Sequence, residues 1–110
     1  MLKISDSQKN IFNVLAVGVL IIDDKGIVVF ANEAYRSFLK MKEEEITGRK
    51  LRDFRPHAQL PTVVESGKAV LHAQRLEGLE EAYFVNMYPL KENGHVVGGI
   101  SMNCGRVPRS

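Results

Sequence analysis

The chain has 110 residues, of which 45% are hydrophobic and 25% charged, the length and composition of one globular domain with one core. Its 15 Lys and Arg and 13 Asp and Glu leave a formal net charge of +2, too small to indicate a nucleic-acid-binding surface. The single cysteine excludes an internal disulfide framework and a cysteine-rich zinc site. No apolar run approaches the roughly 20 residues that span a bilayer, and the N-terminus has too little apolar length for a signal peptide, so we expect a cytoplasmic protein.

The N-terminal segment predicts an amphipathic helix. Ser5 or Asp6 can cap a helix that runs to about Leu15, and Gln8 stands three residues after Ser5, as in a capping box. This helix can pack on the domain's own sheet or pair with a second subunit, and the two roles are compatible. Its apolar side is formed by Ile4, Ile11, Val14 and Leu15.

Two strands and a capped helix follow. Residues 18–23 and 27–31 are aliphatic runs of strand length, and the polar, glycine-containing break between them favours a hairpin. Asn32 stands where a helix N-cap belongs, because its side-chain oxygen can accept a hydrogen bond from an unpaired amide in the first turn. Tyr35, Phe38 and Leu39 give that helix one apolar face.

Several short helices are expected in the middle of the chain. Residues 41–48 predict an acidic helix that Gly48 stops, and residues 49–54 add about one more turn. Because Pro61 suits the first turn of a helix, we expect residues 61–66 to form a helix that ends at Gly67, with Val63 and Val64 on its buried side.

The C-terminal half predicts three strands, over residues 68–75, 81–90 and 95–104. Tyr83, Val85 and Met87 alternate with Phe84, Asn86 and Tyr88, which is the period-2 pattern of a half-buried strand. The Asn93-Gly94 pair is a strong hairpin signal. The order of one helix, two strands, short helices and three antiparallel strands argues for an α+β fold.

Five short pieces resemble, in order and spacing, the pattern of a PAS domain: residues 18–23 (GVLIID), Gly26, 32–34 (NEA), 44–48 (EEITG) and 94–100 (GHVVGGI). The resemblance covers about residues 11–103. It implies a five-stranded antiparallel sheet with short helices over one face, enclosing a small cavity, and structural roles for Asn32 and Gly48. On this basis we expect residues 1–110 to be a single PAS domain, with a flanking helix at 1–16, a core at 17–104 and the start of a linker at 105–110.

Residues 55–67 (RPHAQLPTVVESG) are similar to the helix before the third strand in sensory PAS domains of two kinds of bacterial protein. One kind is the sigma-54-dependent enhancer-binding transcription regulator, and the other is the sensor histidine kinase. The resemblance implies a regulatory module whose output domain, either an ATPase with a DNA-binding domain or a kinase, belongs to the parent chain. No Walker phosphate loop or kinase motif occurs in these 110 residues.

Three functions are compatible with this reading. The first is a sensor that binds a small anionic or apolar ligand, and the second is a ligand-free homodimerisation module that pairs through its N-terminal helix and sheet. The third, a redox or light sensor, would need haem or flavin, and we expect neither cofactor. His57 lies between two prolines, and Cys104 closes the last strand, whereas the reactive cysteine of flavin photoreceptors lies in the helical half.

We also expect no enzyme activity, no metal site, and no direct contact of this domain with nucleic acid or membrane. No nucleophile has a neighbouring His/Asp relay in the sequence, and residues 43–45 (EEE) are typical of a solvated helix. The cavity itself can be filled or open. Bulky side chains could fill it, and glycines on the last strand could leave it open. The bulky side chains are those of Phe54, Leu60, Phe84 and Met102, and the glycines are Gly98 and Gly99.

Arg55 with His57 is the best candidate for a ligand site, since two donors at the mouth of an apolar cavity can orient a carboxylate. The alternative is that Arg55 pairs with an acidic residue such as Asp53 or is solvated. Tyr83 and Tyr88 should lie on opposite strand faces, so at most one reaches the cavity. The candidate ligand-binding residues are Arg55, His57, Leu60, Val64, His72, Tyr83, Asn86 and Met102.

Overall fold

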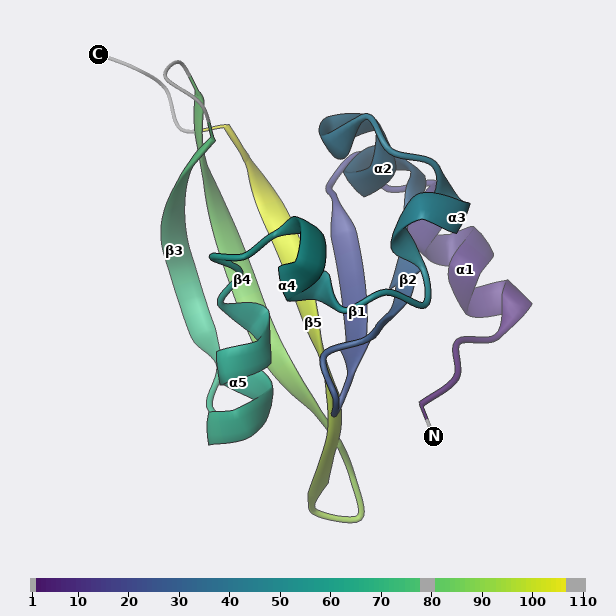
Figure 1. Ribbon diagram of the computed structural model, residues 1–110, viewed down its shortest axis with the longest axis vertical. Coiled ribbons are helices and arrows are strands. Elements are labelled where there is room, and N and C mark those ends of the chain that lie inside the picture. Colours follow the sequence, from purple (N-terminus) through teal and green to yellow (C-terminus); the bar gives the residue numbers. More distant parts are fainter. Residues whose placement is uncertain (1, 78–80, 107–110) are drawn as a thin grey trace.

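The apolar runs from both halves of the chain form one antiparallel sheet with strand order β2-β1-β5-β4-β3 (Figure 1). The computed structural model describes residues 2–77 and 81–106, apart from the side chains of 74–77, 81–82 and 104–106. The last strand inserts between the first and the fourth, which brings the two halves of the chain together. The α+β expectation is confirmed. The strands are β1 Val19–Asp23, β2 Val28–Ala31, β3 Val70–Glu77, β4 Glu81–Glu92 and β5 His95–Arg106.

Both predicted hairpins are present. The Asp23 carboxylate accepts hydrogen bonds from the backbone amides of Lys25, at 2.8 Å, and Ile27, at 3.0 Å, and so folds the turn between β1 and β2. Asn93 and Gly94 both have positive φ, 52° and 81°, as a two-residue turn between twisted strands requires. β4 and β5 each extend two residues beyond the predicted ends.

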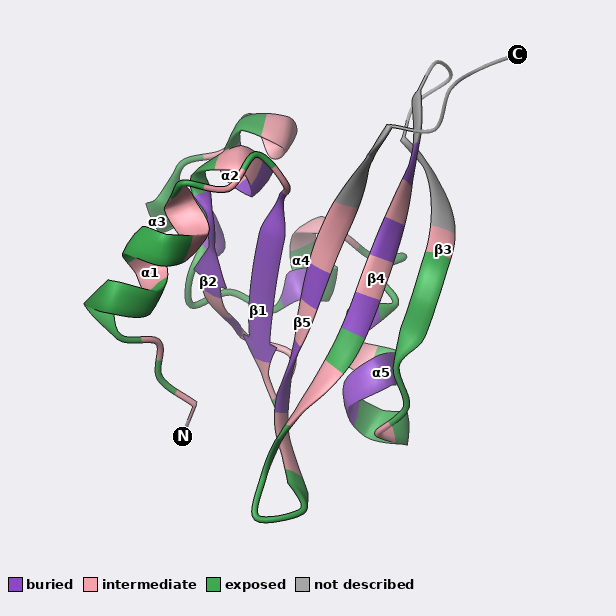
Figure 2. Ribbon diagram, turned by 180° about the vertical axis from the view of Figure 1, so that it is seen from behind, coloured by how far each residue is buried: buried purple, intermediate pink, exposed green. Residues whose placement is uncertain are grey.

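Four short helices lie over one face of the sheet, and α1 lies beside β2 on the other side (Figures 1 and 2). The predicted capping box is confirmed, because the Gln8 amide donates to Ser5 Oγ at 3.2 Å and the Ser5 amide donates to Gln8 Oε1 at 2.9 Å. α1 ends two residues earlier than expected. The helices are α1 Asp6–Asn13, α2 Glu33–Leu39, α3 Glu43–Ile46, α4 Leu51–Phe54 and α5 Leu60–Ser66.

The core consists of two clusters, one on each face of the sheet, because successive side chains of a strand point to opposite sides. Leu20 and Ile22 of β1 pack under the four short helices. Val19 and Ile21 pack on the outer face, against the N-terminal segment. β1 is therefore buried on both faces, as Figure 2 shows along most of its length. The outer cluster includes Leu2, Ile4, Phe12, Leu15 and Phe30.

The predicted apolar side of the N-terminal helix divides between two environments. Ile4 and Leu15 flank α1 and pack on the outer face of the sheet, together with Phe12, which the sequence did not single out. Ile11 and Val14, in contrast, are 61% and 81% exposed. Both roles considered for this segment therefore have residues available, and the pairing role stays a prediction.

Asn32 is confirmed as the N-cap of α2, and it does more than cap. Its Oδ1 accepts from the Tyr35 amide at 3.0 Å and from the Val19 amide at 2.8 Å. Its Nδ2 donates to the carbonyl oxygens of Phe12 and Val17, at 2.8 and 2.9 Å. One fully buried side chain thus joins α1, β1 and α2. Gly48, at φ 86°, ends α3 in the left-handed region, as expected of it.

Candidate functional site

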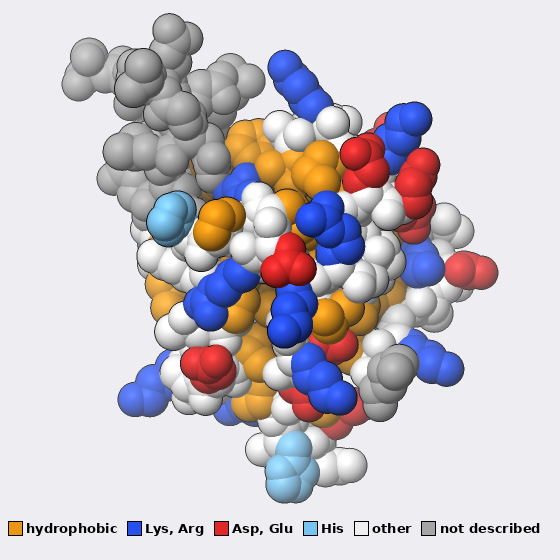
Figure 3. Space-filling model, viewed as in Figure 1, with side chains coloured by type: hydrophobic (Ala, Val, Ile, Leu, Met, Phe, Trp, Pro, Cys, Tyr) orange, Lys and Arg blue, Asp and Glu red, His pale blue; other side chains and the backbone are white. Residues whose placement is uncertain are grey.

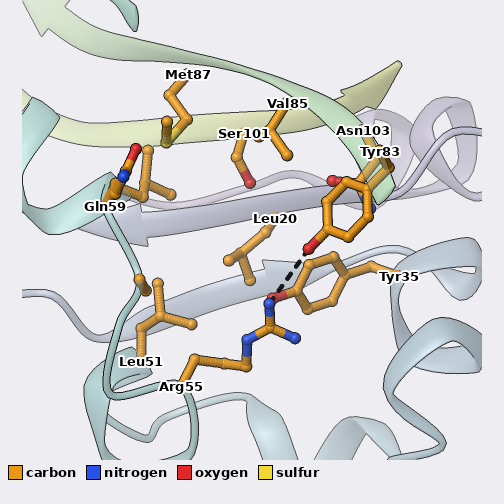
Figure 4. Close-up of a pocket in the computed structure, with 12 residues that line it drawn as sticks. Leu20, Tyr35, Leu51, Arg55, Gln59, Tyr83, Val85, Met87, Ser101 and Asn103 are labelled. Atoms are coloured by element: carbon orange, nitrogen blue, oxygen red, sulfur yellow. Dashed lines mark hydrogen bonds between the residues drawn. The ribbon is translucent and has the colours of Figure 1, made fainter. Parts of the chain in front are cut away.

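A small cavity of about 40 Å³ lies between the sheet and the segment that joins α4 to α5 (Figure 4). β1, β4 and β5 form its floor, and α2, α4 and α5 contribute its walls. Most of the lining is apolar, with hydroxyl, amide and guanidinium groups among it. The lining residues are Leu20, Tyr35, Leu51, Arg55, Ala58, Gln59, Leu60, Tyr83, Val85, Met87, Ser101 and Asn103.

Arg55 extends across this cavity. Its backbone caps α4 by donating to the Leu51 carbonyl at 2.8 Å, which fixes where the side chain starts. Its Nη2 then donates to the Tyr83 hydroxyl on β4 at 3.3 Å. In Figure 4 the hydroxyl of Tyr35 also points toward the guanidinium. A cation, two phenol groups and an apolar floor are therefore adjacent.

The segment 55–59 is held from the opposite side by Arg52. The Arg52 Nε and Nη2 both donate to the Ala58 carbonyl, at 3.3 and 3.2 Å, and Nη2 also donates to Thr62 Oγ1 at 2.9 Å. The predicted helix over residues 61–66 is confirmed as α5. It begins one residue earlier than predicted and stops, as predicted, at Gly67, whose φ is 71°. Leu60, at the start of α5, lies against the cavity.

Of the predicted ligand-binding residues, the structure brings Arg55, Leu60 and Tyr83 together at the cavity. His57 is exposed in the segment before α5 and does not line it. Val64 lies on the buried side of α5, where it packs toward Gly99, and it does not line the cavity. Whether any of these residues binds a ligand stays a prediction.

Asn86 and Met102 are placed on the outer face of the sheet. They pair with each other across β4 and β5, and Met102 packs in the outer cluster. Asn86 Oδ1 accepts from the backbone amide of His72 at 2.7 Å, where β3 has an irregular register and His72 has φ 58°. His72 is therefore at an exposed sheet edge, not at the cavity.

Ser101 and Asn103 line the cavity, and the sequence analysis missed both. Residues that pair across antiparallel strands share a face, and Ser101 pairs with Met87 while Asn103 pairs with Val85. Their spacing of two along β5 was the available signal, but without the register it did not say which face they occupy. Tyr35 was assigned only to an apolar helix face.

Gly98 and Gly99 of β5 do not leave open space. A Cβ on Gly99 would lie 2.8 Å from Val64 Cγ2 and 3.0 Å from Leu60 Cδ1, so α5 already occupies that volume. A Cβ on Gly98 would lie 2.3 Å from the Ile22 carbonyl oxygen and 2.8 Å from Leu2 Cδ2. The expectation that they enlarge the cavity is wrong, because both serve close packing.

Further features of the described residues concern metal binding, membrane insertion and surface charge. Among the described residues, no group of three His, Cys, Asp or Glu side chains is placed to hold a metal ion. Within ranges 2–77 and 81–106, no helix is long and apolar enough to cross a membrane. Lys and Arg are interspersed with Asp and Glu over the helix-bearing face shown in Figure 3. The side chain of Cys104 lies outside the described residues.

A sheet in this order, with short helices that enclose a cavity against one face, defines a small α+β domain of the kind expected from the sequence. The family model described as the PAS fold matches residues 8–87, and the chain belongs to the PAS family.

Its relatives include sensor kinases. The chain is 30% identical over 92 residues to a "Probable C4-dicarboxylate sensor kinase" from Halalkalibacterium halodurans, which covers 83% of this chain. The chain spans only 17% of the length of that kinase. The curated relative is a sensor kinase, which agrees with one of the two expected parent classes. The other, an enhancer-binding regulator, stays a prediction.

Solved PAS domains share the fold. The PAS domain of histidine kinase ThkA has a TM-score of 0.69 at 16% identity, over 79% of this chain and 96% of that one. The PAS domain of nitrogen regulation protein NR(II) from Vibrio parahaemolyticus has 0.65 at 19%, over 89% and 97%. A sensory box sensor histidine kinase from Vibrio cholerae has 0.71 at 12%, over 92% and 89%. The chain is thus similar to the sensory PAS domains of bacterial histidine kinases.

Proposed function

We propose that this chain is a non-catalytic sensory module that binds a small anionic molecule in its cavity and thereby controls an output domain of its parent protein. The observation that carries the proposal is the Arg55 guanidinium, which crosses an apolar cavity to the Tyr83 hydroxyl. An arginine beside apolar walls binds a carboxylate more strongly than one in water, because screening is weaker there. The planar guanidinium can also grip both carboxylate oxygens at once.

The comparison with known proteins is consistent with an anionic ligand. The name of the curated relative refers to a dicarboxylate, although this chain corresponds to 17% of that kinase and the name does not say which part binds it.

The size of the cavity limits the ligand. A volume of about 40 Å³ has room for about three water molecules, since each needs at least 10–15 Å³. Pockets for larger organic ligands measure about 300–1,000 Å³. A ligand of more than a few atoms therefore needs more room than the cavity offers, which outward movement of the segment between α4 and α5 would supply.

The same small volume favours a second candidate function, a ligand-free pairing module. In that case Leu60, Met87 and their neighbours fill the space permanently, and the domain acts only by joining two copies. For a sensor, by contrast, the ligand must bind one pairing state more tightly than the other, because equal affinity shifts no equilibrium.

Native mass spectrometry separates the two candidates. For a sensor we expect freshly purified protein to carry a small additional mass that is lost on denaturation and that identifies the ligand. Protein that stays free of added mass at saturating concentrations of acetate, succinate and the cell's small-metabolite extract would favour the pairing module.

Replacing Arg55 tests the residue that carries the proposal. We expect Arg55→Ala to weaken binding of the identified anion by about 10- to 100-fold, the range for losing a hydrogen bond to a charged group. Arg49→Ala is the matched control, because Arg49 donates to the Glu45 carbonyl and lies over the Phe54 ring, away from the cavity. Isothermal titration calorimetry measures both. Equal affinities of the two variants would contradict a role for Arg55.

A further inference from the structure

The weakest wall of the cavity is the segment 55–59, which is neither helix nor strand. Arg55, Ala58 and Gln59 from this segment line the cavity, and Leu60 follows at once in α5. Among the described backbone bonds, one closes the segment on itself, from the Ala58 amide to the Arg55 carbonyl at 3.0 Å. Backbone bonds also join its two ends to the flanking helices, from the Arg55 amide to the Leu51 carbonyl at 2.8 Å and from the Thr62 amide to the Gln59 carbonyl at 3.0 Å. None of these described bonds joins the segment to the sheet, so its position against the sheet depends on side chains.

Arg52 contacts the segment from the solvent side and fixes its position. Its guanidinium reaches two acceptors together, the Ala58 carbonyl within the segment and the Thr62 hydroxyl in the first turn of α5. The planar fork of an arginine can bridge two such acceptors in a fixed geometry, which a lysine ammonium on a flexible stem does not reproduce. Arg52 thus joins α4 to the last part of the segment and to the first turn of α5.

We propose that Arg52 is a positioning residue for the cavity: it keeps the segment 55–59 closed so that Arg55 reaches Tyr83. Arg52 and Arg55 stand three residues apart and hold the same segment from opposite sides. Release of Arg52 frees the segment to move outward, which enlarges the cavity for a ligand of more than a few atoms. The effect of Arg52 on ligand binding rests on the proposed function, whereas its effect on the position of segment 55–59 does not.

Hydrogen exchange and NMR on the whole chain test this role. We expect R52Q to speed amide exchange of residues 58–63 by about 10-fold or more, the loss for a hydrogen bond to a charged group, while exchange in β1 and β5 stays unchanged. We also expect the ring signals of Tyr83 to shift, because Arg55 no longer stays in place across the cavity. R52K should not restore either signal.

Two variants keep the test decisive. R49Q is the matched control, because Arg49 makes the same kind of bond to a carbonyl, at 3.0 Å on α3, without touching the segment. T62V removes one acceptor of Arg52 with little change of shape, so it reports on the hold even if R52Q folds poorly. We expect T62V to show a smaller increase in exchange over the same residues.

Three outcomes would overturn the inference. They are unchanged exchange in both R52Q and T62V, equal exchange in R52Q and R49Q, or faster exchange with unmoved Tyr83 signals. The last would mean that Arg52 stabilises the surface without positioning the cavity. None of these readouts involves a ligand, so the inference can fail while the Arg55 binding test succeeds, and the reverse.

Discussion

At the scale of the single residue, Asn32 is the clearest case of one side chain that holds several elements together. It satisfies two backbone amides and two backbone carbonyls with one amide group, at a site without solvent exposure. Without it the backbone amides of Val19 and Tyr35 would lie buried and unpaired, and an unpaired buried polar group costs about 1–3 kcal/mol. The residue therefore fixes the N-terminal segment to the sheet and α2 to both.

We expect Asn32→Ala to lower the free energy of unfolding by about 2–4 kcal/mol, less than the sum over four groups because water can reach some of them. Asn13→Ala is the control, because Asn13 also accepts from an amide of α2, that of Glu33 at 2.9 Å, but on the surface. The control should lose about 1 kcal/mol or less. Urea unfolding followed by circular dichroism compares the two, and similar losses would contradict the role given to burial.

The cap at Asn32 was predictable from the sequence, but its three other bonds were not. An N-cap bond joins residues three apart, so the local pattern contains it. The bonds to Val19, Phe12 and Val17 join residues 13, 20 and 15 positions apart, and they exist only because the chain folds back over β1. Sequence patterns of period 2 or 3.6 hold no information on such pairs.

At the scale of the element, the strands and short helices were predictable because each has a local signal. Hydrophobic period, capping residues and glycines at positive φ placed all ten elements to within a few residues. The candidate site was less predictable, because it depends on register. Asn86 and Met102 were chosen where Ser101 and Asn103 were needed, and a shift of one residue moves a side chain to the other face.

The contact of α5 with β5 depends on the missing side chain of Gly99. We expect Gly99→Ala to destabilise the domain by about 1–3 kcal/mol, because the added methyl forces Val64 and Leu60 to shift. Ser101→Ala, on the same strand and face, is the control and should cost about 1 kcal/mol or less. Thermal unfolding measures both. A neutral Gly99→Ala would show that α5 moves off the sheet freely.

At the scale of the whole molecule, two exposed apolar residues of the N-terminal segment are the candidates for pairing with a second copy. Ile11 and Val14 lie on the side of the N-terminal segment that its own sheet leaves uncovered. Isolated exposed apolar residues are ordinary, so the pairing surface stays a prediction until association is measured.

We expect Ile11→Asp to weaken self-association by about 10-fold or more, since a carboxylate placed in an apolar contact loses its hydration. The sheet should stay folded, because Ile11 contributes nothing to either buried cluster. Asn10→Asp, an exposed change on the same helix, controls for the added charge. Sedimentation equilibrium measures both, and unchanged association of Ile11→Asp would refute this placement.

The alternation of side chains along β5 has a consequence for how the domain can relay an event. Ser101 and Asn103 face the cavity, while Ile100 and Met102, one residue away on the same backbone, pack against the outer cluster that includes the N-terminal segment. β5 is hydrogen-bonded on both sides, so it tilts only together with β1 and β4. The three strands would then move together as one part of the sheet. A change in the cavity that bends β5 therefore also displaces the side chains that β5 packs against the N-terminal segment, because the two sets of side chains belong to the same strand.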